Sequence, residues 1–150
     1  VEVIGARRTQ VDDPRADRMI TNDQLFGELP DADVVVLACP LTEETRGMVD
    51  TDFLAAMSPR GVLVNVSRGA VVDTPALLDA LDAGRPAAAL LDVFEVEPLP
   101  DDSPLWDHPK VTLTSHVAGA GSGGVPRGDQ VFLDQLRDYL ADRPLRLEVR

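Results

Sequence analysis

The stretch Val34-Val35-Val36-Leu37-Ala38 decides the fold class of this 150-residue chain. It is apolar throughout and β-branched at its start, and it ends at Cys39-Pro40. Such a run is typical of a strand that is buried inside a parallel sheet. Pro40 then forces a loop, because proline has no backbone N–H to donate to a ladder.

Other apolar runs alternate with helical patterns along the chain. We expect strands over residues 1–6, 62–66, 87–92 and 111–113, and helices over residues 22–29, 51–57, 73–84 and 127–141. The stretch between the first strand and residue 22 reads as polar. Strands and helices in this alternation predict right-handed crossovers and an α/β fold, a Rossmann-like doubly wound parallel sheet covered on both faces.

The composition narrows the class of partner. A net charge of -12, from 26 acidic and 14 basic residues, argues against nucleic acid or an anionic membrane surface as a partner. Cys39 is the single cysteine, which excludes an internal disulfide, and no apolar run reaches the roughly 18 residues of a membrane span. We therefore expect a cytoplasmic protein with a small-molecule partner.

Arg68 directly follows the predicted strand 62–66. Ligands of open parallel sheets bind beyond the carboxyl ends of the strands, so Arg68 would point into that crevice. Gly69 gives the turn a freedom that a bulkier residue would restrict. A surface arginine paired with a nearby carboxylate is the competing interpretation, and position alone leaves both open.

Glu97 and His116 follow the next two predicted strands and reach the same sheet edge. A carboxylate that accepts one ring N–H fixes the histidine tautomer, so that the other nitrogen can transfer a proton near neutral pH. Taken separately, Glu97 could be a solvated loop acid and His116 a capping or core histidine. Because both residues reach the same sheet edge, an acid–base pair of Glu97 and His116 is as well supported as these separate structural roles.

Three ordered segments, residues 65–73, 91–100 and 115–119, resemble the successive signatures of the D-isomer-specific 2-hydroxyacid dehydrogenases. Residues 39–47 are similar to that family's turn beside the cofactor adenosine. The resemblance implies an NAD(P)-dependent oxidoreductase, acting as a homodimer, that transfers a hydride between nicotinamide C4 and a 2-oxo or 2-hydroxy acid of the glyoxylate or hydroxypyruvate type.

The resemblance also implies residue roles. Arg68 would hold the substrate carboxylate and polarise the 2-oxo group, His116 would donate or accept the proton, and Glu97 would pair with His116. Asp92 would bind the nicotinamide carboxamide, and no metal site is expected. The full set expected to line the cofactor is Arg7, Arg8, Cys39, Pro40, Thr45, Val66, Ser67, Arg68, Asp92, His116 and Gly119.

The end of the first strand predicts the choice of cofactor. An acidic residue there binds the ribose 2′-hydroxyl of NAD, whereas arginine accommodates the 2′-phosphate of NADP. Arg7-Arg8 stands at this position. We therefore favour NADP over NAD, the alternative being two arginines that face water.

The glycine-rich pyrophosphate loop of dinucleotide-binding folds is absent from the sequence, and residues 119–121 do not replace it because they open no helix directly after a strand. We expect residues 1–119 to form a partial NAD(P)-binding domain that starts at its second strand. Residues 120–150 would form a hinge, within the glycine-rich stretch 119–128, and a helix that returns to a substrate domain. The alternative is a truncated, noncatalytic nucleotide- or protein-binding module.

Overall fold

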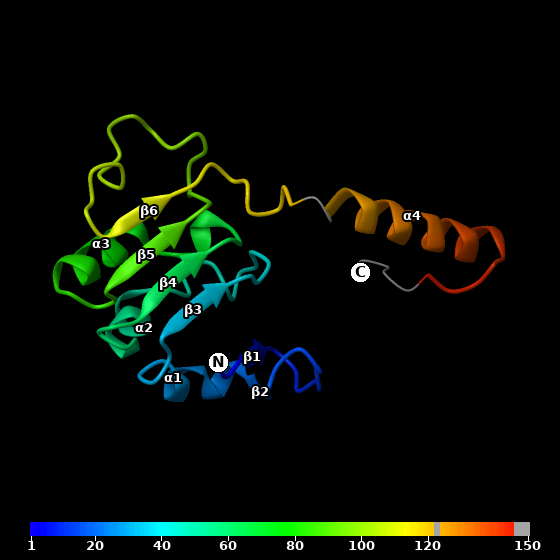
Figure 1. Cartoon of the computed structure of the whole chain (residues 1–150), viewed down its shortest axis with the longest axis horizontal. Helices are drawn as coiled ribbons and strands as arrows, with labels where there is room; N and C mark the ends of the chain where they lie inside the picture. The colour runs from blue at the N-terminus through cyan, green and yellow to red at the C-terminus, as the bar shows by residue number, and fades with distance from the viewer. Residues whose placement is uncertain (122–123, 146–150) are drawn as a thin grey trace. The chain divides into compact units, whose positions relative to one another are not determined.

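Four parallel strands form the main sheet of the protein, in the order β3-β4-β5-β6 (Figure 1). The structure is a computed structural model, which describes residues 1–121 and 124–145. The strands are β3 (Val34–Leu37), β4 (Val62–Asn65), β5 (Ala88–Leu91) and β6 (Val111–Leu113). Every neighbouring pair is parallel. This confirms the predicted Rossmann-like α/β fold.

Two helices, α2 (Thr51–Ala56) and α3 (Thr74–Asp82), connect the first three of these strands. Each begins at an aspartate whose side chain accepts a backbone N–H: Asp50 from Phe53 at 2.9 Å and Asp73 from Ala76 at 3.0 Å. These caps satisfy N–H groups that a helix start leaves without partners. The helices and one face of the sheet enclose the core, which includes Leu37, Phe53, Leu54, Leu63, Leu77, Leu81, Ala89 and Leu91.

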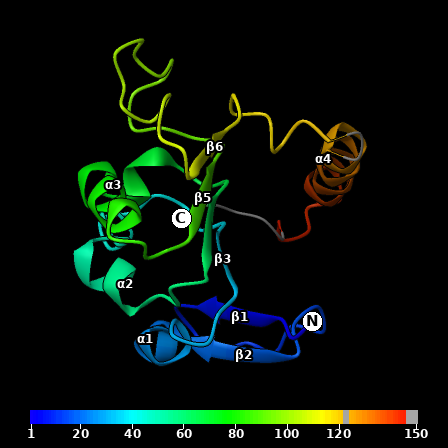
Figure 2. The ribbon, with the colours of Figure 1, turned by 60° about the vertical axis from the view of Figure 1, so that its left-hand side comes forward.

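Several side chains on the opposite face of the sheet are exposed within the unit Val1–Ser115. Val34, Val36 and Leu90 are 56%, 57% and 43% exposed. Successive side chains of a strand point to opposite faces. Because α2 and α3 lie on the same side of the sheet (Figure 2), only the alternate set of side chains is buried.

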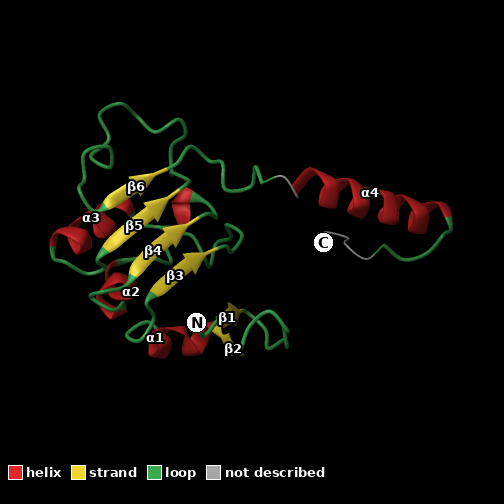
Figure 3. Cartoon of the chain, viewed as in Figure 1, coloured by secondary structure: helices red, strands yellow, loops and turns green. Residues whose placement is uncertain are grey.

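A second, two-stranded parallel sheet precedes the main one and consists of β1 (Ile4–Arg7) and β2 (Arg18–Thr21) (Figure 3). The sequence did not predict β2, because Ile20 is its only buried side chain and no apolar run marks it. A 3-10 turn, η1 (Asn22–Gln24), and the short helix α1 (Leu25–Glu28) follow. Phe26 contacts Phe53 of α2 edge-on, with ring centroids 5.9 Å apart.

The chain divides into two compact units, Val1–Ser115 and His116–Arg150. The second unit contains α4 (Gly124–Leu140), which starts three residues before the predicted helix. Its exposed apolar side chains include Phe132, Tyr139 and Leu140. Residues 122–123 of the predicted hinge lie outside the described residues. No helix in the described part of the chain is long and apolar enough to cross a membrane.

Candidate functional site

Asn65, the last residue of β4, shapes the turn that presents Arg68. The Asn65 side chain is 1% exposed. Its Oδ1 accepts the backbone N–H of Ser67 at 3.0 Å and the Ser67 hydroxyl at 2.8 Å, and its Nδ2 donates to the carbonyl of Arg68 at 3.0 Å. One buried amide therefore holds three groups of the turn. Asn65 was not among the predicted site residues, because its only signal in the sequence is a polar residue at the end of a buried strand.

Arg68 stands exposed at the carboxyl edge of the sheet, with an extended backbone. Its Nη1 donates to the carbonyl oxygen of Ser67 at 2.6 Å. Among the described residues, Arg68 forms no ion pair with a carboxylate, and its role in substrate binding stays a prediction. Its remaining N–H groups suit a carboxylate ligand, since guanidinium binds such groups bidentately.

Gly69 begins the 3-10 turn η2 (Gly69–Val71) and brings the loops after β4 and β5 into contact. A Cβ at Gly69 would lie 1.8 Å from the carbonyl carbon of Phe94 and 2.2 Å from the nitrogen of Glu95. The reason for glycine here is thus the close approach of two backbones. Conformational freedom in the turn was the predicted reason for Gly69, whereas the structure gives the close contact with Phe94 and Glu95 as the reason.

The loop after β5 carries two of the predicted site residues. Asp92 is 4% exposed, and its backbone N–H donates to the carbonyl of Asn65 at 3.0 Å. The Thr114 hydroxyl, just after β6, donates to Oδ1 of Asp92. Glu97 is exposed, and its Oε1 accepts the backbone N–H of Phe94 at 2.9 Å. Thr114 was not among the predicted site residues, and its hydroxyl fixes the Asp92 carboxylate across neighbouring strands.

His116 is the third residue after the end of β6 and opens the second unit. It is exposed, and its φ of 54° lies in the left-handed region. Histidine enters this region more often than most residues, and such conformations cluster at functional sites. The pairing of His116 with Glu97 stays a prediction, as does a role for Gly119.

The turn after β3 is held by Thr45. The Thr45 hydroxyl donates to the carbonyl of Pro40 at 2.8 Å and accepts the backbone N–H of Thr42 at 2.8 Å. Cys39 is partly buried and packs against the core. Gly47 donates to the carbonyl of Ala70 at 2.9 Å, so this turn lies beside η2. The loops that follow β3, β4 and β5 therefore meet at one edge of the sheet, with Val66 partly exposed there.

The two arginines predicted to select the cofactor lie elsewhere in the first unit, at the end of β1. Arg7 is the last residue of β1, and its Nη2 is 3.6 Å from Oδ2 of Asp13. Arg8 follows it and is exposed. Both guanidinium groups are accessible to an anionic ligand.

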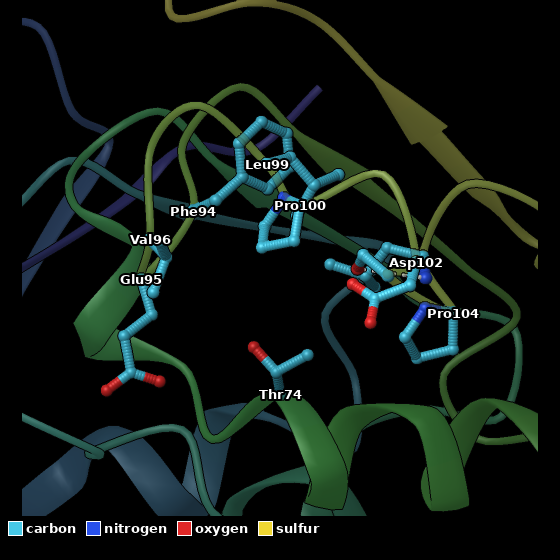
Figure 4. A pocket seen from close by; sticks show the side chains of 10 residues that line it. Thr74, Phe94, Glu95, Val96, Leu99, Pro100, Asp102 and Pro104 are labelled. Atoms are coloured by element: carbon cyan, nitrogen blue, oxygen red, sulfur yellow. Dashed lines mark hydrogen bonds between the residues drawn. The ribbon is translucent and has the colours of Figure 1, made fainter.

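A shallow pocket of about 340 Å³ lies between the start of α3 and the loop after β5 (Figure 4). Thr74, Glu95, Leu99 and Asp102 contribute to its lining. Arg68, Asp92 and Glu97 do not line it. The pocket therefore shares a loop with the candidate site without containing its charged groups. The described residues contain no group of three or more His, Cys, Asp or Glu side chains that could hold a metal ion.

A parallel sheet of four strands joined by crossover helices is the architecture of the Rossmann-like nucleotide-binding proteins. Within that class, residues 1–118 match the NAD binding domain of D-isomer specific 2-hydroxyacid dehydrogenases, and the chain belongs to this family. The recognised resemblance is thereby confirmed.

Relatives of known structure support the assignment. The chain is 37% identical to a D-isomer specific 2-hydroxyacid dehydrogenase from Xanthobacter autotrophicus Py2, solved with NADPH and MES, with a TM-score of 0.87 over 99% of this chain and 61% of that one. It is 31% identical to an NADPH-dependent glyoxylate/hydroxypyruvate reductase from Sinorhizobium meliloti, solved with NADP and sulfate, with a TM-score of 0.83 over 97% of this chain and 46% of that one.

A curated relative extends the comparison. The D-3-phosphoglycerate dehydrogenase of Bacillus subtilis (strain 168) is 42% identical over 107 residues, which are 71% of this chain and 20% of that protein. The chain thus spans about a fifth of this relative and about half of the solved ones.

Proposed function

We propose that the protein acts as an oxidoreductase that transfers a hydride between NADPH and a small 2-oxo acid of the glyoxylate or hydroxypyruvate type. The observation that carries the proposal is the sheet edge at which Arg68, Asp92 and Glu97 follow neighbouring strands in a chain of the 2-hydroxyacid dehydrogenase family. The S. meliloti relative, an NADPH-dependent glyoxylate/hydroxypyruvate reductase, supports the substrate class.

The residues present suit a nicotinamide at this edge. An ionised carboxylate only accepts hydrogen bonds, and the Thr114 hydroxyl helps to fix the Asp92 carboxylate at the end of β5. The Asp92 carboxylate would accept an N–H of the carboxamide. The turn 39–47 and the strand end at Val66 and Ser67 would lie along the cofactor. When bound, NADPH supplies the hydride, and all other steps fall to the protein's own side chains.

The catalytic residues in this proposal are Arg68 and His116, with Glu97 as a positioning residue. Arg68 would hold the substrate carboxylate and polarise the 2-oxo group. His116 would give its ring proton to the carbonyl oxygen as the new C–H bond forms, and Glu97 would accept the other ring N–H. The positive charges at Arg68 and His116 would stabilise the charge that grows on that oxygen, an effect that can reach several kcal/mol.

The preference for NADPH over NADH is proposed from Arg7 and Arg8, whose guanidinium groups would bind the 2′-phosphate. The double variant Arg7→Asp/Arg8→Ser should weaken binding of NADPH far more than binding of NADH. An equal loss for both cofactors would reject the preference and leave the oxidoreductase proposal standing.

The test of the reaction is NADPH oxidation by the native protein with glyoxylate and hydroxypyruvate. We expect His116→Gln to lower kcat by at least about 100-fold. Arg68→Ala should raise KM and lower kcat, each by at least about 100-fold. Arg60→Ala is the matched control, because Arg60 is an exposed arginine just before the opposite end of β4. No oxidation with either acid would contradict the proposal and favour the noncatalytic binding module.

The same proposal includes a homodimer in the cytoplasm and a return of residues 120–150 to a substrate domain. Family resemblance supports the dimer, and the single, partly buried thiol of Cys39 fits a reducing compartment. Light scattering of the native protein measures the oligomeric state directly. A monomeric mass would reject the dimer.

A further inference from the structure

Two arginines lie at the carboxylate of Asp13: Arg7, the last residue of β1, and Arg15, in the loop before β2. We call Arg7, Asp13 and Arg15 the Asp13 cluster. Arg15 donates hydrogen bonds to both carboxylate oxygens of Asp13. Its Nε donates to Oδ1 at 2.8 Å and its Nη2 to Oδ2 at 2.6 Å, while its backbone N–H donates to Oδ1 at 3.1 Å.

Arg7 has a different relation to the same carboxylate. Its Nη2 lies 3.6 Å from Oδ2, beyond hydrogen-bond distance, although it is close enough for electrostatic attraction. Arg8 forms no ion pair within the described residues. The Asp13 cluster therefore consists of one hydrogen-bonded pair, Asp13 with Arg15, and of Arg7, which lies within ion-pair distance of the same carboxylate without a hydrogen bond to it.

The half-buried Asp13 stays ionised. Hydrogen bonds from the side chain and the backbone N–H of Arg15 hold the pKa of Asp13 well below its usual range. Its negative charge thus persists at every pH near neutrality and lies beside Arg7. Without Arg15, the nearest remaining cation for this carboxylate is Arg7.

We propose that Arg15 is a specificity-determining residue for the 2′-phosphate of the cofactor, because it occupies Asp13 and so keeps Arg7 available to bind a phosphomonoester. Arg15 acts here through Asp13 and Arg7, as a positioning residue. The inference rests on the proposed use of Arg7 and Arg8 for the 2′-phosphate and adds the device that keeps Arg7 accessible.

This role makes an unusual prediction about charge. Removing one positive charge at Arg15 weakens binding of a phosphomonoester, as any cation loss would. Removing the negative charge of Asp13 as well should then restore the preference for a ligand that carries the 2′-phosphate, because Arg7 no longer has a carboxylate to pair with. A loop that merely needs the Asp13–Arg15 pair for its shape would lose the preference in both variants.

The experiment compares two nucleotides that differ only in the 2′-phosphate, adenosine 2′,5′-bisphosphate and adenosine 5′-monophosphate. Their Kd values for the full 150-residue chain are measured by NMR titration. We expect Arg15→Ala to reduce the preference for the bisphosphate about two- to fivefold, the range that exposed ion pairs give. Asp13→Asn/Arg15→Ala should bring the preference back to that of the unsubstituted chain.

Asp12 supplies the matched control, because Asp12→Asn/Arg15→Ala makes the same change in net charge at the neighbouring position. We expect this variant to stay as weak as Arg15→Ala. Equal recovery with the Asp12 control, no recovery with the Asp13 variant, or an unchanged preference in Arg15→Ala would each overturn the inference while Arg7 and Arg8 keep their role. An unsubstituted chain that shows no preference would overturn both this inference and the proposed use of NADPH.

Discussion

Gly69 is the residue at which two loops of the candidate site contact each other through their backbones. A methyl group there would overlap the Phe94–Glu95 peptide, which belongs to the backbone and cannot rotate away. We expect Gly69→Ala to lower the free energy of unfolding by about 1–3 kcal/mol, the usual cost of overpacking. Urea unfolding of the purified chain measures this loss.

Gly27 is the control for that prediction. It lies in α1, and a Cβ at Gly27 would meet no atom within 4 Å. Gly27→Ala should therefore stabilise the chain slightly, by up to about 1 kcal/mol, because alanine is the better helix former. If both variants behaved alike, the close approach at Gly69 would not be the reason for its glycine.

Asn65 and Thr114 show why the candidate site was only partly predictable at the residue scale. Arg68, Glu97 and His116 could be placed at one edge because each follows an apolar run, and strand ends of a parallel sheet share an edge. The contacts of Asn65 with Ser67 and of Thr114 with Asp92 depend instead on backbone turns and on strand pairing. No local pattern specifies those contacts.

At the scale of elements, the strands differ in how visible they are in the sequence. β3 and β4 lie in continuous apolar runs, and the prediction located them to within a residue or two. β2 carries arginine at its start and buries one side chain, so periodicity could not reveal it. Polar contacts support its pairing with β1: the backbone N–H of Val3 donates to Asp17 at 2.8 Å, and Arg18 lies 3.7 Å from Glu2. A hydrophobic pattern carries no signal for such contacts.

The polar contact between β2 and α1 predicts a dependence on pH. Arg18 donates two hydrogen bonds to Glu28, at 2.6 and 2.8 Å, and these bonds lower the pKa of the Glu28 carboxyl. A carboxyl with a depressed pKa in the folded state stabilises that state above its unfolded pKa of about 4.3. This contribution is lost as the pH falls through the lower folded value.

We therefore expect amides of β2 and α1 to exchange faster with solvent as the pH falls from 5 to 3, after correction for the intrinsic exchange rate, by hydrogen exchange followed by NMR. Glu28→Gln removes the titrating group and should flatten this part of the pH dependence. If the pH dependence of amide exchange were the same in Glu28→Gln as in the unsubstituted chain, the Arg18–Glu28 pair would not be what holds β2 to α1.

At the scale of the whole molecule, the unit Val1–Ser115 covers one face of its main sheet with crossover helices and exposes apolar side chains on the other. Leu37, Leu63 and Leu91 point into the core between the sheet and its two crossover helices. Val36 and Leu90 point the other way and remain exposed. Exposed apolar groups gathered on one face of a sheet are available to bind other apolar surfaces.

Adjacent valines of β3 test this division of the sheet. Val35 packs against the core and Val36 is 57% exposed, although both have the same side chain and the same strand. Val35→Thr should cost about 1–3 kcal/mol, because it places a hydroxyl against apolar side chains. Val36→Thr should change the free energy of unfolding by less than about 0.5 kcal/mol, as surface substitutions usually do. Urea unfolding separates the two, and a native-state apolar dye should bind less to Val36→Thr. A larger loss of stability in Val36→Thr than in Val35→Thr would mean that the exposed face is the one that holds the molecule together.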